Sequence, residues 1–162
     1  MKNFPIIDKE TGREYWISRS VAVVGYVHKQ GCILAIQRGK GTPDPEFVGK
    51  WCLPCGYLDY DETCWEAVKR EIHEETGILI NENNSVLNGT EVNSDPKADK
   101  RQNVTIRYKI WYCGNDELST KFSEKNEVSD IKWIPIDEVD NYEWAFNHKE
   151  LIKDYNNDIF NS

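Results

Sequence analysis

Three glutamates, Glu71, Glu74 and Glu75, lie close together near the middle of the sequence and could bind a metal ion. They fall in a predicted helix over 63–76, which begins with a Thr-x-x-Glu capping box and ends just before a glycine. At about 100° per residue, the three carboxylates occupy an arc of roughly 100° and can converge on one point. Hard oxygen ligands in this arrangement favour Mg²⁺ or Mn²⁺.

The other positions of this helix argue against the alternative of a solvated acidic face. The same arc, one or two turns earlier, carries the small or apolar residues Cys64, Ala67 and Val68. The opposite side is predicted to carry Glu66, Lys69, His73 and Thr76. The three carboxylates therefore continue an inward-facing stripe, where their mutual repulsion requires a compensating cation.

A longer motif surrounds the glutamates. Residues 56–78 read GYLDYDETCWEAVKREIHEETGI, with Gly56, Glu62 and Arg70 at fixed spacing from the acidic cluster. This string resembles the Nudix box at every defining position, and the segments 36–38, 49–54 and 133–138 resemble the flanks of that family. The resemblance covers roughly residues 20–155 and implies a Nudix-type α/β/α sandwich with a central mixed β-sheet.

The resemblance also implies metal-dependent hydrolysis of a diphosphate bond in a nucleoside diphosphate linked to another moiety. Divalent cations suit this chemistry because they stabilise the charge that develops as a P–O bond breaks and lower the pKa of the attacking water. By resemblance, Glu71, Glu74 and Glu75 are the metal ligands, and Glu74 is also counted as catalytic. Arg70 matches the catalytic-site arginine that orients a box carboxylate, and its alternative is a surface pair with Glu66.

Many Nudix enzymes bring a further carboxylate to the site from a loop across the sheet. Glu124 and Glu127 are the candidates here, and Glu127, six residues before Trp133, is placed as that residue is in some relatives. We therefore predict Glu127 as a metal ligand or general base, with an ordinary solvated loop acid as the alternative.

Three arginines, Arg38, Arg101 and Arg107, are predicted to contact the phosphates or ribose of the substrate. Surface charge and core packing remain alternatives for each of them. The segment 94–102 resembles the region that follows the box in ADP-ribose-type members, which favours an ADP-ribose-like nucleoside diphosphate sugar. The alternatives are a MutT-like nucleoside triphosphate pyrophosphohydrolase and a non-catalytic Nudix domain that senses a ligand.

The cysteines could indicate a different class of protein. Cys52 and Cys55 have the spacing of half a zinc site or of a redox pair, but no second pair follows. Five cysteines, an odd number, favour reduced and mostly buried thiols. Cys55 also stands where the family usually has the first glycine of a Gly-Gly pair, and its Cβ restricts the backbone more than glycine would.

The composition limits the partners. The chain has 162 residues and a formal charge of −8, which argues against nucleic acid or an anionic membrane as a partner. Its N-terminal segment lacks the apolar run of a signal peptide, so we expect a cytoplasmic protein. We expect one domain spanning residues 1–162, and homodimers are common among the relatives that it resembles.

Strands and helices are predicted to alternate irregularly along the chain, which favours a mixed sheet with helices on its faces. Strands are expected over 20–28, 32–37, 51–53, 86–92, 103–113 and 130–134. A turn is expected over 54–59, loops over 39–49, 93–103 and 115–126, and a closing helix over 146–155.

Overall fold

The computed structural model describes residues 3–97, 101–123 and 126–160. Its strands are β1 (Phe4–Ile7), β2 (Glu14–Ile17), β3 (Val21–Lys29), β4 (Cys32–Arg38), β5 (Trp51–Cys52), β6 (Cys55–Tyr57), β7 (Ser85–Asn93), β8 (Val104–Tyr112) and β9 (Val128–Pro135). Its helices are α1 (Cys64–Thr76), α2 (His148–Phe160) and the 3₁₀ segments η1 (Pro45–Phe47), η2 (Thr120–Phe122) and η3 (Ile136–Asn141).

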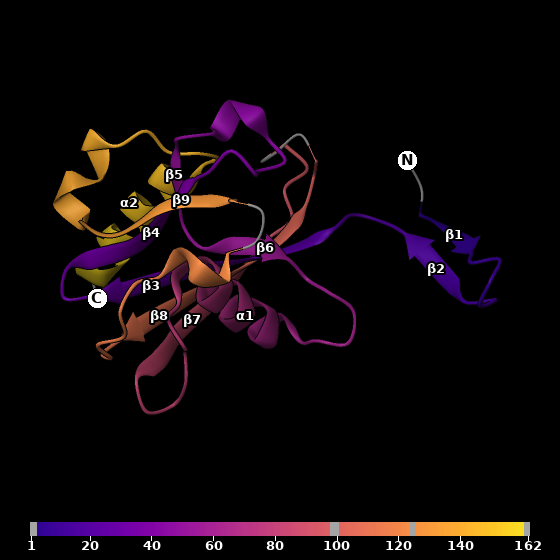
Figure 1. The fold of residues 1–162 in the computed structure, drawn as a ribbon, viewed down its shortest axis with the longest axis horizontal. Helices are drawn as coiled ribbons and strands as arrows, with labels where there is room; N and C mark the ends of the chain where they lie inside the picture. Colours follow the sequence, from indigo (N-terminus) through magenta and orange to yellow (C-terminus); the bar gives the residue numbers. More distant parts are fainter. Residues whose placement is uncertain (1–2, 98–100, 124–125, 161–162) are drawn as a thin grey trace.

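A seven-stranded mixed sheet forms the body of the molecule (Figure 1). Its main path runs β5-β4-β3-β8-β7, with β3 and β8 parallel and the other pairs antiparallel. Strands β3 and β4 pair only beside their hairpin turn, at His28–Ile33 and Lys29–Cys32. Beyond that point β6 pairs with β3, whereas β5 and β9 pair with β4, so the sheet divides into two parts.

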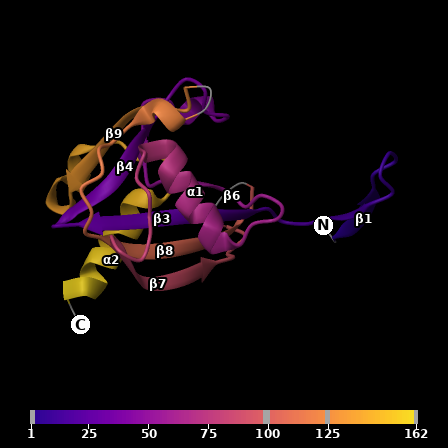
Figure 2. The same ribbon diagram turned by 60° about the horizontal axis from the view of Figure 1, so that its bottom comes forward.

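The two main helices cover opposite faces of this sheet. Because successive strand residues point to opposite faces, β3 divides its buried residues between two cores. Val23 and Val27 pack in the core that contains α1, whereas Val24 and Tyr26 pack in the core that contains α2. Figure 2 shows α1 and α2 separated by β3. The expected α/β/α sandwich with a mixed sheet is confirmed.

Most of the predicted elements agree with the structure to within two residues at each end, but two differ at the places that matter for the site. The expected turn over 54–59 contains the short strand β6. The closing helix ends at Phe160 rather than at residue 155, and it begins at His148 rather than at residue 146 because Phe146 has a left-handed backbone with a φ of 56°. A residue in the left-handed region cannot be part of a right-handed α-helix, so the helix begins after Phe146.

The N-terminal hairpin of β1 and β2 was not predicted. Its alternation of apolar and polar residues is weak, and most of its side chains are exposed, including Ile7 at 65% and Trp16 at 63%. Figure 1 shows the hairpin extending away from the main sheet. It therefore adds nothing to the buried cores of its own chain.

The prediction for the outer side of α1 was wrong near its C-terminal end. Thr76 is fully buried, and the ring of His73 stacks against Phe122 with their centroids 4.5 Å apart. The backbone N–H of Ser119 also donates to the carbonyl of Thr76 at 2.8 Å. Segment 119–122 therefore covers a turn that the helical wheel assigned to solvent.

Within the described ranges, no helix is both long and apolar enough to cross a membrane.

Candidate active site

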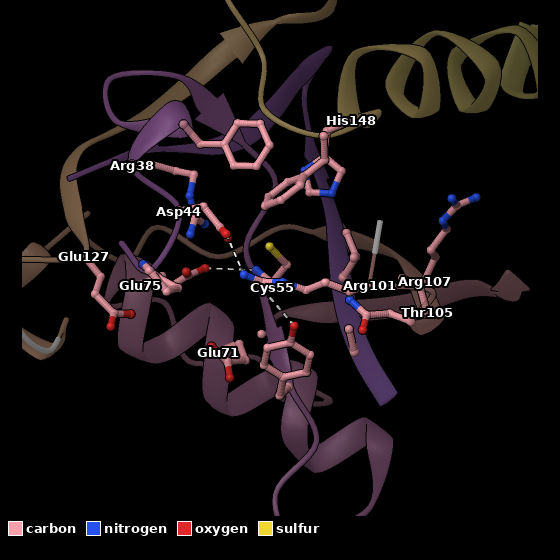
Figure 3. Close-up of a pocket in the computed structure, with 18 of the residues that line it drawn as sticks. Arg38, Asp44, Cys55, Glu71, Glu75, Arg101, Thr105, Arg107, Glu127 and His148 are labelled. Carbon is pink, nitrogen blue, oxygen red and sulfur yellow. Dashed lines mark hydrogen bonds and ion pairs between the residues drawn. The ribbon is translucent and has the colours of Figure 1, made fainter. Parts of the chain in front are cut away.

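A cavity of about 760 Å³ lies where β4 separates from β3 (Figure 3). Its walls come from both parts of the divided sheet and from α1, which places residues that are distant in sequence side by side. The predicted site residues that line it are Arg38, Glu71, Glu74, Glu75, Arg101, Arg107 and Glu127. Arg70, the remaining predicted site residue, is not part of this lining.

The helix that carries the acidic cluster is fixed at both ends as its sequence predicts. Thr63 and Glu66 form the reciprocal capping box, and Gly77 ends the helix with a φ of 80°. Glu71 then packs directly against Gly56 of β6. A Cβ at position 56 would overlap the Glu71 carboxylate, although the φ of Gly56 is not positive. Glycine at position 56 therefore leaves space for the Glu71 carboxylate rather than serving the turn.

Arg70 connects three of the box carboxylates. Its guanidinium donates to both carboxylate oxygens of Glu62, at 3.0 and 2.7 Å. It also donates to Glu71 at 2.8 Å and to Glu74 at 3.1 Å. The hydrogen bonds from Arg70 to Glu62 lower the pKa of Glu62 below its usual value. Glu66 is used in the cap, so the alternative surface pair between Arg70 and Glu66 is not observed.

Glu75 is held by the residue that departs from the family pattern. The backbone N–H of Cys55 donates to Oε2 of Glu75 at 3.0 Å (Figure 3). Cys55 lies in an extended strand paired with Val24, so its Cβ is accommodated without a left-handed backbone. Burial raises the pKa of the Glu75 carboxyl well above its usual range, and electrostatic interactions with the Cys55 thiol and with Glu71 add to the rise, whereas the hydrogen bond from the Cys55 backbone opposes it.

The acidic set suits a divalent cation, although its ligands are not fully gathered. No group of three His, Cys, Asp or Glu side chains within the described ranges is close enough to form a complete metal cluster. Burial also raises the pKa of Glu71, and the charge of Glu74 contributes to the rise. A cation would relieve this accumulation of negative charge, and carboxylate oxygens are the ligands that hard divalent metals prefer.

Glu127 reaches the cavity from the loop before β9. The N–H of Gly39 donates to the carbonyl of Glu127 at 2.6 Å, and the N–H of Gly41 donates to that of Asn126 at 3.1 Å. A side chain on Gly39 would collide with the Asn126 carbonyl. The glycines after β4 thus fix the backbone of this acid at the cavity. The other candidate, Glu124, lies outside the described residues.

The three predicted arginines meet the cavity from different elements. Arg38 contacts the neutral groups of Thr42 and Cys52, and its Nε is a buried atom without a partner among the described residues. Arg101 donates to Asp44 at 2.5 Å and to the Tyr57 hydroxyl at 3.0 Å, as Figure 3 shows. Of the three, Arg38 is a partly buried cation that forms no ion pair with a carboxylate among the described residues.

Arg107 projects from β8 and is 9% exposed. Glu91 accepts from it at 3.0 Å and also accepts from the Tyr155 hydroxyl at 2.6 Å. The guanidinium is thus fixed in orientation at the wall of the cavity.

Segment 143–148 contributes residues that sequence analysis missed. Backbone bonds join Trp51 N–H to the carbonyl of Glu143 and Ala145 N–H to that of Trp51, each at 2.8 Å. Phe146 and His148 then line the cavity. In the sequence Phe146 and His148 belong to the predicted closing helix, and it is the bridge between Trp51 and Trp144 that brings them to the site.

His148 gives the fold a measurable sensitivity to acid. Burial, together with the charges of Arg107 and Arg38, lowers its pKa from 6.5 to about 3. The unfolded chain therefore takes up this proton at a higher pH than the folded chain does, and the resulting stability is lost as the pH falls from about 6.5 towards 3.

We expect urea unfolding at pH 7 and pH 5.5 to show a larger loss of stability in the wild type than in His148→Asn. The difference should approach about 1 kcal/mol, since one differentially bound proton contributes at most about 1.4 kcal/mol per pH unit. Identical pH dependence in the two proteins would mean that His148 is not held neutral.

Comparison with known proteins defines the class of this site. The NUDIX domain model matches residues 16–155, so the chain belongs to the Nudix family. It is an enzyme of the class that hydrolyses pyrophosphate bonds. Over 153 residues it is 35% identical to the ADP-ribose pyrophosphatase of Methanocaldococcus jannaschii, covering 93% of this chain and 82% of the relative.

Two solved structures share its fold. The NUDIX domain of Shewanella oneidensis NrtR, complexed with ADP ribose, has a TM-score of 0.66 and 22% identity, covering 88% of this chain and 90% of that chain. A bifunctional NMN adenylyltransferase/ADP ribose pyrophosphatase from Francisella tularensis, complexed with AMP and a Mn ion, has a TM-score of 0.65 and 24% identity. The match covers 84% of this chain and 40% of that one.

Proposed function

We propose that this chain hydrolyses the diphosphate bond of ADP-ribose or a closely similar nucleoside diphosphate sugar, using Mg²⁺ or Mn²⁺. The observation that carries the proposal is a single cavity of about 760 Å³ in which the box carboxylates face three arginines. That volume suits a small-molecule substrate. The choice of ADP-ribose is supported by the relative from Methanocaldococcus jannaschii.

The residues divide the work by position. Glu71, Glu74 and Glu75 would hold the divalent cation, which when bound supplies charge stabilisation at the phosphate oxygens and lowers the pKa of an attacking water. Arg70 orients Glu71 and Glu74 through its two hydrogen bonds to them. Arg38, Arg101 and Arg107 would bind the phosphates or ribose, because guanidinium groups form paired hydrogen bonds with phosphate oxygens.

Product analysis with the purified protein tests this function. ADP-ribose, ATP and dGTP would each be supplied with Mg²⁺ or Mn²⁺, and the products separated by chromatography. We expect ADP-ribose to give AMP and ribose 5-phosphate. Release of pyrophosphate from a nucleoside triphosphate in preference would identify a MutT-like enzyme, and binding without turnover would identify a ligand-sensing domain.

We further propose that Glu127 acts as general base or metal ligand. Glu127→Gln should lower kcat by about 100-fold, because an amide neither accepts the water proton nor attracts a cation as a carboxylate does. Glu124→Gln and the exposed loop variant Glu117→Gln serve as controls, and each should stay within a few-fold of the wild type. A small effect at Glu127 would confine the chemistry to α1, and a large effect only at Glu124 would transfer the role to that residue.

The N-terminal hairpin supports a proposal that the chain forms a homodimer. Phe4, Ile6 and Trp16 are 45%, 47% and 63% exposed on a hairpin that packs against neither buried core. Exposed apolar groups of this density are typical of protein interfaces. Light scattering coupled to gel filtration should give about twice the chain mass of 18.9 kDa, and a monomer mass would contradict the proposal.

We also propose that residues 1–162 act as one Nudix domain in the cytoplasm. The support is chemical: all five cysteines are free thiols, including the neighbouring pair Cys52 and Cys55. Reduced thiols are typical of that compartment. Cys55 lines the cavity and holds Glu75 through its backbone N–H, whereas Cys52 is buried in the core.

A further inference from the structure

Phe146 occupies a strained position at the wall of the cavity. Its φ of 56° places it in the left-handed region, which non-glycine residues enter uncommonly. Its side chain is nevertheless 44% exposed, so burial of the ring does not account for the strained backbone. Backbone strain of this kind concentrates at ligand-binding sites, where the surrounding structure imposes it.

The surroundings of Phe146 form a flat-sided recess. The ring centroid of Phe47 lies 4.7 Å from that of Phe146, and the centroid of His148 lies 5.2 Å from it. The guanidinium carbon of Arg38 is 5.3 Å from the Phe146 centroid. All four side chains line the cavity. An aromatic wall beside a cation is suited to a planar group that is attached to an anion.

His148 supplies a fixed donor beside this wall. Its Nδ1 accepts a hydrogen bond from the backbone N–H of Leu53 at 3.0 Å. In the neutral imidazole the other nitrogen, Nε2, must then carry the proton. The His148 side chain makes no other hydrogen bond in the part of the chain that the structure describes. In Figure 3, His148 and Glu71 lie on opposite sides of the drawn residues, and His148 is on the side away from the acidic helix.

The order of groups along the cavity matches the order of groups in a nucleotide. Arg38 contacts the ring of Phe146, and Figure 3 shows its side chain beside Glu75 of the acidic cluster. A phosphate bound at Arg38 would therefore lie between the aromatic recess and the carboxylates. The base attached through its ribose to that phosphate would reach the recess, and the scissile bond would lie over α1.

We propose that Phe146 and His148 form the subsite for the nucleobase of the substrate, a purine that stacks on the Phe146 ring and accepts a hydrogen bond from Nε2 of His148 through a ring nitrogen. The inference rests on the proposed function in so far as the purine is part of a nucleoside diphosphate. It adds which end of that substrate each side of the cavity recognises.

Calorimetric titration with AMP and with ribose 5-phosphate tests the stacking contact without turnover. The wild type should bind AMP at least about fivefold more tightly than ribose 5-phosphate, because stacking of the base on an aromatic side chain contributes that factor or more. Phe146→Leu retains an apolar side chain but loses the aromatic face. It should weaken AMP binding by about five- to tenfold and leave ribose 5-phosphate unchanged.

Phe122→Leu is the matched control, since Phe122 is similarly exposed at 50% but contacts His73 outside the cavity. It should leave the affinity for both ligands unchanged. Equal weakening of both ligands in Phe146→Leu would show that Phe146 only shapes the cavity. Equal affinity of the wild type for the two ligands would overturn the base subsite, and this measurement needs no variant.

The hydrogen bond is tested with 1-deaza, 3-deaza and 7-deaza AMP, each of which lacks one ring acceptor. One of them should bind the wild type about five- to tenfold more weakly than AMP does. His148→Asn keeps an acceptor near the Nδ1 position for Leu53 but removes the Nε2 donor. In His148→Asn, the analogue that binds the wild type weakly should have the same affinity as AMP.

Equal binding of all three analogues to the wild type would remove His148 from base recognition. These titrations also separate the inference from the proposed function. Failure to hydrolyse ADP-ribose alongside Phe146-dependent AMP binding would reject the reaction and keep the base subsite. Hydrolysis of ADP-ribose with AMP binding that does not depend on Phe146 would support the reaction and reject the base subsite.

Discussion

Glu74→Gln is expected to lower turnover by at least about 100-fold at a metal concentration that saturates the wild type. The glutamine is nearly isosteric but carries no charge, so it attracts a divalent cation far less than the carboxylate does. Glu74 is 44% exposed in its side chain and bonded to Arg70 at 3.1 Å, so its loss leaves no buried charge without a partner. The melting temperature should therefore change by only a few degrees.

Glu66→Gln on the same helix is the matched control. Glutamine also completes a capping box, so the helix start should survive, and position 66 lies outside the cavity. Its kcat should remain near that of the wild type. If Glu74→Gln kept full activity over a range of metal concentrations, the acidic cluster of α1 would have no part in the reaction.

The part of the site on α1 could be predicted because its determinants are local. The cap at Thr63, the stop at Gly77 and the spacing of the glutamates all lie within one helix, where the period of 3.6 residues fixes which side chains share a face. The errors at His73 and Thr76 arise from segment 119–122, which packs on the last turn of α1 although it lies more than 40 residues further along the chain. A helical wheel contains no information about such a partner.

The aromatic side of the cavity depends on contacts that are remote in sequence. Phe146 and His148 reach it because Trp51 bonds to the backbone of the preceding residues Glu143 and Ala145 and because the N–H of Leu53 donates to the His148 ring. In the sequence they appear as the start of a helix, which is where the prediction placed them. Cys55 was similarly expected to restrict a turn, yet it forms part of β6, because pairing with Val24 keeps its backbone extended.

Gly56→Ala should reduce kcat by about 10- to 100-fold while leaving the fold intact. A methyl group at position 56 would overlap the carboxylate of Glu71, which is the flexible end of its side chain, so the carboxylate rather than the backbone should move. The displaced Glu71 would lose its 2.8 Å hydrogen bond from Arg70. Disruption of such orienting contacts typically costs 10- to 100-fold in metal affinity or activity.

Gly89→Ala in β7 is the matched control, because a methyl group there would meet only the Lys109 side chain at an ordinary 3.8 Å. Its kcat should equal that of the wild type. Half-saturating metal concentration and melting temperature, measured for both variants, separate the two explanations of any loss. A higher metal requirement with an unchanged melting temperature in Gly56→Ala would place the effect at Glu71. A fall in melting temperature that accounts for the lost activity would mean that Gly56 serves the packing of β6 rather than the position of a metal ligand, because the backbone and not the carboxylate would then have yielded.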